Sequence, residues 1–446
     1  MNIRRAVTTG GTRLTALLIF TSYASAQTTS WELETLYSFN PERGGPPVAG
    51  VAIATGGVLF GTTDGNETGT VFSLSPPASP GGAWTEHVLH VFGSSYLDGS
   101  YPGAGVAIGG GGVLYGTTQY GGSLETCQQE FTGCGTVFSV TPPASPGGAW
   151  TEAVIHSFDG EDGNLPASSL AIGRGGVLYG TTARGGTALE SLCGTVFSLT
   201  PPATSGGAWT EAVLYSFPGT GSEGCGPQNL AIGTGGELYG TSSSGGASNA
   251  GSVFSLTPPR SPGGAWAEKV LYSFGYEGSG FPVSYPSPGL AIGRDGVLYG
   301  TTGVGGTGTA CSQAGCGTLF SLTPPASPDG AWIENALYSF GGGPTDGASP
   351  QGVVIGTGPS GRSVLYGTTS SGGTGTCGCG TAYSLTPPAS PGGAWTEIIL
   401  YNFTPATEIG YVSPGLTIGK DGALYGATGA LDVDGQGYGS AFALVQ

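Results

Sequence analysis

Short apolar and β-branched runs, each bounded by glycine or proline, recur along this chain in one order. A phrase close to W-T-E-x-x-L-Y-S-F is followed by P-x-x-L-A-I-G, then G-V-L-Y-G-T-T, then G-T-V-F-S-L-T-P-P. Each run predicts a β-strand, and four antiparallel strands per repeat are typical of a propeller blade. The seven tryptophans mark the repeats: Trp31, Trp84, Trp150, Trp209, Trp266, Trp332 and Trp395. The sequence therefore predicts an all-β, seven-bladed β-propeller.

The second repeat shows where the strands should lie. We expect the innermost strand A at 104–109, strand B at 113–118, strand C at 135–141 and the outer strand D at 150–158. Two prolines follow strand C and end it, because proline cannot donate to a strand ladder. The other blade units are expected near 48–92, 167–217, 228–274, 288–340, 350–403 and 414–445 plus 31–39.

The two ends of the repeat array are complementary. The array begins with a D-like run at 31–39 and finishes with A-, B- and C-like runs between 416 and 445. The first strand is therefore expected to complete the last blade, which closes the ring and removes exposed strand edges. A parallel β-helix or an open solenoid is the alternative, and it would predict capping repeats at both ends.

Residues 1–26 combine arginines, a short apolar stretch and a final Ala-Ser-Ala, the pattern of a secretory signal peptide. Residues 27–446 are then expected to form one propeller domain that is secreted or held at the cell surface or in the periplasm. No later segment is apolar enough to predict a membrane span. We expect a monomer. The net charge of -17 argues against nucleic acid as a partner, since phosphates would be repelled.

The repeat also resembles a known family. The L-Y-G-T-T followed by G-G, the G-T-V-F-S-L and the L-Y-S-F followed by G and P are similar to the GloVer (Gloeo-Verruco) tandem repeat of secreted bacterial proteins. The resemblance covers nearly the whole mature chain. It implies a propeller-like repeat and brings no catalytic residues with it.

The loops differ between the two faces of the predicted ring. The A-B and C-D connections are short or nearly identical, which indicates scaffold. The B-C and D-A connections vary and carry all eight cysteines, so a binding site is expected on their face. An even cysteine count in an exported chain predicts disulfides rather than a zinc or redox site. The spacing favours four pairs: Cys127 with Cys134, Cys193 with Cys225, Cys311 with Cys316, and Cys377 with Cys379.

Catalytic groups are scarce. His87, His90 and His156 all fall in D strands, where the last two replace a recurring tyrosine and are expected to be structural. A glutamate follows most tryptophans by two positions, and this series is expected to form a solvated outer row: Glu86, Glu152, Glu211, Glu268, Glu334 and Glu397. The A runs place small neutral residues around the channel. We therefore assign no catalytic residue and lean against an enzyme.

Aromatic and acidic side chains of the variable loops are the remaining ligand candidates, since exposed rings suit stacking on sugars or anchoring a protein partner. They are Tyr96, Asp98, Tyr101, Tyr120, Phe131, Asp162, Tyr276, Phe281, Tyr285, Asp346, Tyr411 and Tyr438. Asp432 and Asp434 resemble the start of a calcium loop, and no other cofactor is expected. The prediction is a binding or scaffolding module for extracellular polysaccharide or a surface protein. The alternatives are a polysaccharide hydrolase or lyase that uses rim carboxylates, and a purely structural surface protein.

Overall fold

The structure is a computed structural model with two compact units, Met1–Ser30 and Trp31–Gln446. It describes residues 30–446 except 66–67, 80, 124–126, 128–132, 146, 188–192, 205, 220–222, 262, 276–284, 312–313, 328–329, 359–360, 375–377, 391, 405–410 and 430–437. The expected signal peptide at 1–26 lies outside the described residues. The account below concerns the second unit.

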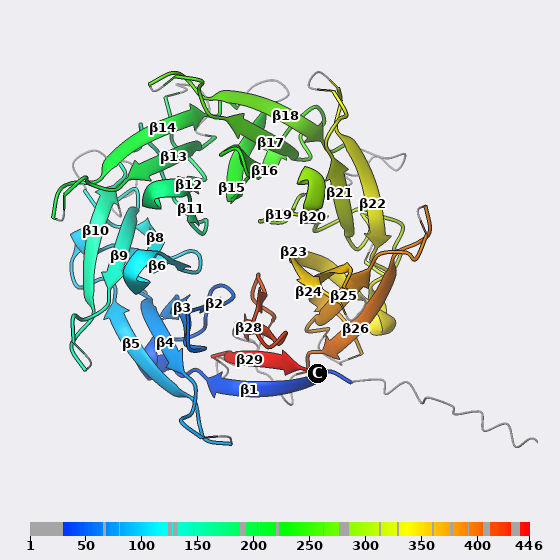
Figure 1. Cartoon of the computed structure of the whole chain (residues 1–446), viewed down its shortest axis with the longest axis horizontal. Coiled ribbons are helices and arrows are strands. Elements are labelled where there is room, and N and C mark those ends of the chain that lie inside the picture. The colour runs from blue at the N-terminus through cyan, green and yellow to red at the C-terminus, as the bar shows by residue number, and fades with distance from the viewer. Residues whose placement is uncertain are drawn as a thin grey trace, which may run out of the picture. The chain divides into compact units, whose positions relative to one another are not determined.

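Seven antiparallel sheets follow one another around a ring (Figure 1), and the predicted seven-bladed propeller is confirmed. Blade 1 contains β2 (Ala52–Ile53), β3 (Leu59–Thr63), β4 (Thr70–Ser75) and β5 (Thr85–Val91). Blade 2 contains β6 (Ser100–Pro102), β7 (Ala107–Ile108), β8 (Leu114–Tyr120), β9 (Thr136–Thr141) and β10 (Thr151–Ser157). Blade 3 contains β11 (Ala171–Ile172), β12 (Leu178–Thr181), β13 (Thr195–Thr200) and β14 (Thr210–Ser216).

The remaining blades repeat this order. Blade 4 contains β15 (Gly224–Ile232), β16 (Leu238–Gly245), β17 (Ser252–Thr257) and β18 (Ala267–Ser273). Blade 5 contains β19 (Ala291–Ile292), β20 (Leu298–Thr302), β21 (Thr318–Thr323) and β22 (Ile333–Ser339). Blade 6 contains β23 (Gly347–Thr357), β24 (Ser363–Gly372), β25 (Thr381–Thr386) and β26 (Thr396–Asn402). Blade 7 contains β27 (Thr417–Ile418), β28 (Leu424–Thr428), β29 (Ser440–Val445) and β1 (Glu32–Ser38).

Short 3-10 turns occur at Pro41–Arg43, Tyr96–Asp98, Gly110–Gly112, Arg174–Gly176, Arg294–Gly296 and Gly343–Thr345. In five blades the inner strand is only two residues long, shorter than the sequence predicts, whereas β15 and β23 have 9 and 11 residues. In blade 2 an additional strand, β6, pairs with β8 ahead of β7. No separate strand at the position of β6 is predicted from the sequence.

Strand β1 closes the ring. It pairs antiparallel with β29, from Glu32 opposite Val445 to Ser38 opposite Ser440, so the first strand completes the last blade as predicted. Figure 1 shows β1 on the outside of this sheet, in the position that β5, β10 and the other D strands occupy in their blades. The D strand of every blade therefore lies at the periphery.

Aromatic rings join each blade to the next. The phenylalanine that follows each D strand packs on the aromatic residue of strand C in the following blade, edge to face except for the tilted pair Phe403–Phe442. At the closing junction Phe39 and Phe72 have centroids 4.9 Å apart. The glycine of Leu-Tyr-Gly-Thr-Thr provides space for the strand C ring. A Cβ on Gly180, for example, would lie 2.5 Å from Phe197. Repetition of these contacts around the ring explains why the motif recurs with so little change.

Hydroxyl groups satisfy each other beneath the same rings. Strands B and C exchange a buried side-chain hydrogen bond in each blade, such as Thr118 to Thr136 at 2.8 Å and Thr182 to Thr195 at 2.9 Å. These threonines come from the G-T-T and G-T parts of the repeat. Pairing two hydroxyls lets a polar group be buried without leaving a donor unsatisfied.

Disulfides lie on the face of the B-C and D-A loops. The structure pairs Cys127 with Cys134, Cys311 with Cys316, and Cys193 with Cys225. These are pairs that the spacing predicts. Cys379 is also disulfide-bonded, and its predicted partner Cys377 lies outside the described residues. Among the described residues, no helix is long and apolar enough to cross a membrane.

Candidate functional site

The D-A loops share a motif that the loop-length variation conceals. Four of them contain an acidic residue, a glycine, two further residues and a proline: Asp98 to Pro102, Asp162 to Pro166, Glu223 to Pro227 and Asp346 to Pro350. The residue before the proline has a positive φ in each, at Tyr101, Leu165, Gly226 and Ser349. Its amide donates to the carbonyl of the residue two positions before strand C in the preceding blade, as from Leu165 to Cys134 at 3.1 Å. The motif therefore links each loop to the neighbouring blade.

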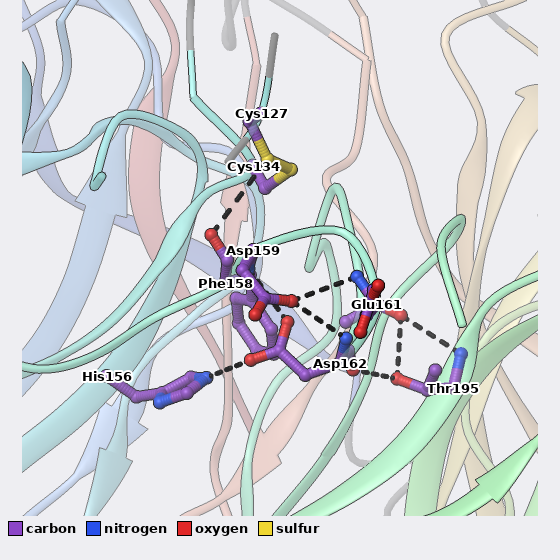
Figure 2. A network of polar contacts seen from close by, with 9 residues as sticks. Cys127, Cys134, His156, Phe158, Asp159, Glu161, Asp162 and Thr195 are labelled. Carbon is purple, nitrogen blue, oxygen red and sulfur yellow. Dashed lines mark hydrogen bonds and ion pairs between the residues drawn. A yellow bond between two sulfur atoms is a disulfide. The ribbon is translucent and has the colours of Figure 1, made fainter. Parts of the chain in front are cut away.

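The acid of this motif, hereafter the loop acid, binds the D strand that precedes it. Asp162 accepts the backbone amide of Asp159 at 2.8 Å and lies 2.8 Å from Nε2 of His156 (Figure 2). The backbone carbonyl of Asp162 accepts Thr195 Oγ1 of the following blade at 2.9 Å. Asp162 thus holds three segments together, and its carboxylate points at His156 rather than into solvent.

The other loop acids repeat this arrangement. Asp98 is 7% exposed, lies 2.8 Å from Nε2 of His90, and accepts the amide of Ser94 at 3.0 Å. Asp346 accepts the hydroxyl of Tyr338 at 3.1 Å and two backbone amides, and Glu223 accepts the hydroxyl of Tyr215. His90 and His156 therefore occupy the positions of these tyrosines, as the sequence suggests. Like the tyrosines, each histidine contacts a carboxylate.

A second carboxylate faces each loop acid from the next blade. This is the glutamate two residues after tryptophan, hereafter the strand glutamate. The expectation of a solvated outer row is wrong for five of these residues: one carboxylate oxygen is buried without a hydrogen-bond partner in Glu86, Glu152, Glu211, Glu268 and Glu397. The sequence pattern of one repeat cannot show this burial.

Burial and like charge shift the ionisation of these groups. Desolvation, and secondarily the charge of Asp98, raises the pKa of Glu152 to about 7. The pKa values of Glu211, Glu268 and Glu397 are also raised to about 7, chiefly by desolvation, with the nearby loop acids contributing. These four strand glutamates are therefore protonated in a pH range where free glutamate is ionised.

At one junction a positively charged residue, Arg43, stands in place of the loop acid. Arg43 stands four residues before Pro47, the position that the acids occupy relative to their prolines, and Pro47 bridges to Thr63 as Pro102 does to Thr118. Nη1 of Arg43 lies 2.8 Å from Oε2 of Glu86. The junction between blades 7 and 1 thus contains an ion pair where others contain two acids.

A bulge in the D strand directs the two kinds of residue to opposite sides. In β10 the register shifts between Val154 and His156, and every other D strand shifts at the equivalent place. Glu152 and His156 are four residues apart and would share one face of a regular strand. Because the bulge reverses the alternation, Glu152 faces Asp98 of the preceding junction, whereas His156 faces Asp162 of the following one.

A cavity of about 340 Å³ lies where the D-A loops lead into the inner strands. Its lining is mostly glycine, alanine and other small residues, with polar side chains from Ser169, Asn229, Gln351 and Thr417. No Asp, Glu, His, Lys or Arg is among the described residues that line it. This agrees with the prediction of a neutral channel wall and places the cavity at the D-A end of the channel.

The predicted aromatic candidates fall into two groups. Tyr96, Tyr285 and Tyr411 are 71%, 47% and 50% exposed. Tyr101 and Tyr120 instead pack edge to face on each other, with centroids 5.5 Å apart. Tyr438 is half-buried against the core of the closing junction. Phe131, Tyr276 and Phe281 lie outside the described residues, as do the calcium candidates Asp432 and Asp434.

The chain matches the model of a known repeat family. The model of the Gloeobacter/Verrucomicrobia repeat matches residues 9–191 and 124–356. The chain belongs to the Gloeobacter/Verrucomicrobia repeat family. No protein with curated annotation matches it.

Solved structures resemble this member of the Gloeobacter/Verrucomicrobia repeat family distantly. An α-L-arabinanase from Penicillium chrysogenum, complexed with arabinobiose, is 12% identical with a TM-score of 0.41, over 93% of this chain and 98% of that one. A protein from Lactobacillus plantarum is 15% identical with a TM-score of 0.48, over 79% and 83%. A glucose dehydrogenase is 14% identical with a TM-score of 0.43, over 93% and 99%. Similarity at this level carries no argument about activity.

The pairs of acidic side chains at the blade junctions of this repeat family member were not predicted from the sequence. The signal was present, because aligning the loops on their prolines places Arg43 in the column of Asp98 and Asp162. The alignment does not show which residue each loop acid faces. That residue is a glutamate some fifty residues further along the chain, at the same period as the repeat.

Proposed function

We propose that this protein is a secreted binding module that takes an uncharged extracellular carbohydrate at the D-A end of the central channel. The neutral, polar lining of the cavity is the observation that carries this proposal. Sugars present hydroxyl groups and apolar ring faces, which suit amide and hydroxyl side chains together with exposed backbone. Disulfides in four places fit an oxidising compartment.

Exposed aromatic rings on the D-A loops support a binding site on the same face. Tyr96, Tyr285 and Tyr411 belong to D-A loops of three different junctions, so a polymer that crosses the channel mouth could meet more than one ring. Tyrosine combines a flat apolar surface with a polar tip and loses little conformational entropy on binding. These residues are proposed as secondary contacts for a longer chain, around a central subsite at Asn229 and Gln351.

Catalysis by rim carboxylates receives less support. Glycoside hydrolysis needs two carboxyl groups that reach a sugar from opposite sides. The acids nominated for this role, Asp98, Asp162 and Asp346, have their carboxylates held in hydrogen bonds within the junctions. The cavity itself is lined by no carboxylate among the described residues. A binding role without turnover is therefore the better proposal.

The test is retention of the mature protein on a panel of immobilised neutral polysaccharides, with release of reducing ends measured in the same samples. Ala167→Trp places a bulky ring at the cavity, where Ala167 is exposed, and should weaken retention about tenfold or more. Ile398→Trp is the matched control, because Ile398 is 53% exposed on outer strand β26, and should leave retention unchanged.

Three results would contradict the proposal. Equal loss in both tryptophan variants would place the binding elsewhere, and release of reducing ends would make the protein an enzyme. Failure to bind any polysaccharide of the panel would redirect the search to a protein partner at the same face.

A further inference from the structure

The junction between blades 1 and 2 differs from the other described junctions in bringing together three metal-ligating side chains at close range. His90 comes from β5, Asp98 from the D-A loop and Glu152 from β10. One ligand atom from each lies within 4.8 Å of the other two, and among the described residues no other group of three does so. Three segments that are distant in sequence thus converge on one point.

The Asp98 and His90 side chains of this site are largely shielded from solvent. The Asp98 side chain is 6% exposed, and the His90 side chain is 19% exposed, which leaves a route from solvent. One carboxylate oxygen of Glu152 is buried and has no hydrogen-bond partner. Glu86, Glu211, Glu268 and Glu397 have the same unpaired oxygen, so the convergence of His90 and Asp98 on Glu152 is what distinguishes this junction.

The closing junction shows where a positive charge belongs in this arrangement. There Arg43 occupies the position of Asp98 and lies 2.8 Å from Glu86, the counterpart of Glu152. The fold therefore accommodates a cation against the strand glutamate. At the junction of blades 1 and 2 the chain supplies two carboxylates and an imidazole instead of a guanidinium, which is a ligand set for an external cation.

We propose that His90, Asp98 and Glu152 bind a divalent transition-metal ion, with Zn²⁺ as the best fit. One imidazole nitrogen and two carboxylate oxygens are typical zinc ligands, and water completes the coordination. Calcium fits less well, because it prefers six or more oxygen ligands.

Metal binding requires the three ligand atoms, which lie within 4.8 Å of one another, to rearrange around the ion. Nε2 of His90 and Oδ1 of Asp98 are 2.8 Å apart, a hydrogen-bond distance, whereas two ligands of a tetrahedral zinc ion lie roughly 3.3 Å apart. The metal must replace the proton between these atoms, so the imidazole carries its remaining proton on Nδ1.

The chain itself offers a matched variant. Tyr338 donates its hydroxyl to Asp346 at the junction of blades 5 and 6, so His90→Tyr should keep the donor to Asp98 while removing the nitrogen ligand. His156→Tyr is the control, because His156 makes the same kind of contact to Asp162 without belonging to the three-residue group.

The experiment is calorimetric titration of the EDTA-treated, dialysed mature protein with ZnCl₂ and, separately, with CaCl₂, together with thermal unfolding in each ion. We expect one zinc ion per chain and a higher Tm in zinc for the wild type and His156→Tyr, and loss of both effects in His90→Tyr.

The proposal is overturned if the wild type binds no zinc, if His90→Tyr binds it as well as the wild type, or if both tyrosine variants lose it equally. Binding of calcium but not zinc would overturn the assignment of the ion. A fold check by circular dichroism on His90→Tyr distinguishes loss of the ligand from loss of the structure.

Discussion

The strand glutamates of blades 3, 4 and 6 should make this propeller less stable as the pH rises. Glu211, Glu268 and Glu397 have pKa values raised from 4.5 to about 7 in the folded protein. Between these values the unfolded chain loses protons that the folded chain retains. The contribution of these groups to stability is therefore most favourable below about pH 4.5. It falls between about pH 4.5 and about pH 7, and the destabilisation is complete above about pH 7.

The size of the effect follows from the shifts. A rise from 4.5 to about 7 corresponds to a ceiling of about 3 kcal/mol for each carboxyl. Because these side chains are only partly buried, solvent screening reduces this to about 1 kcal/mol each. The triple variant Glu211→Gln, Glu268→Gln and Glu397→Gln should therefore gain about 3 kcal/mol relative to the wild type at alkaline pH, and much less in mild acid.

The assay is urea unfolding followed by tryptophan fluorescence at about pH 5 and about pH 8, for the wild type and the triple variant. The difference between the two proteins isolates these carboxyls from the other titrating groups. Glu86→Gln serves as the opposite control, because Glu86 accepts from Arg43 and Tyr37, and it should lower stability at both pH values. A triple variant with the same pH dependence as the wild type would refute the reasoning.

Two further predictions concern the links between blades. Gly135→Ala should destabilise by about 2 to 4 kcal/mol, because Gly135 has a φ of +94° and its Cβ would lie 2.6 Å from Pro166 of the next loop. Gly110→Ala, where a Cβ meets nothing within 4 Å, should change stability by no more than about 0.5 kcal/mol, and equal effects in urea unfolding would contradict the packing argument. Replacing both Cys193 and Cys225 by serine should cost about 3 kcal/mol, because their bond joins blades 3 and 4 across 32 residues. An unchanged Tm in the serine variant, compared with the wild type under oxidising conditions, would contradict the prediction for this disulfide.

Much of the fold could be predicted because the determining features are local and repeated. A four-strand pattern bounded by glycine and proline predicts a blade, and a lone D-like run at 31–39 predicts ring closure, which the pairing of β1 with β29 confirms. The cysteine spacing likewise favours pairs that the structure contains. The short inner strands and β6 were less predictable, because a ladder ends where the partner strand turns away.

The candidate sites were predicted only in part. Sequence alone directed attention to the D-A face and offered Asp98, Asp162 and Asp346 as ligand candidates, but it did not predict the hydrogen bonds that hold their carboxylates at the junctions. The exposed rings of Tyr96 and Tyr411 could be expected on the loops. Which aromatic residues pack against their own loop could not be expected, since this depends on neighbours that a linear pattern does not name.

The sequence by itself determined the propeller, the order of its strands and the way the ring closes. Only the tertiary structure decided what each junction contains. A bulge sends Glu152 and His156 to opposite sides of one strand, so Glu152 faces Asp98 of the preceding junction, whereas at the closing junction Arg43 faces Glu86. The physical reason is that ionisation and metal-ligating power depend on which charges are brought close and shielded from water, and these charges come from segments far apart in the chain.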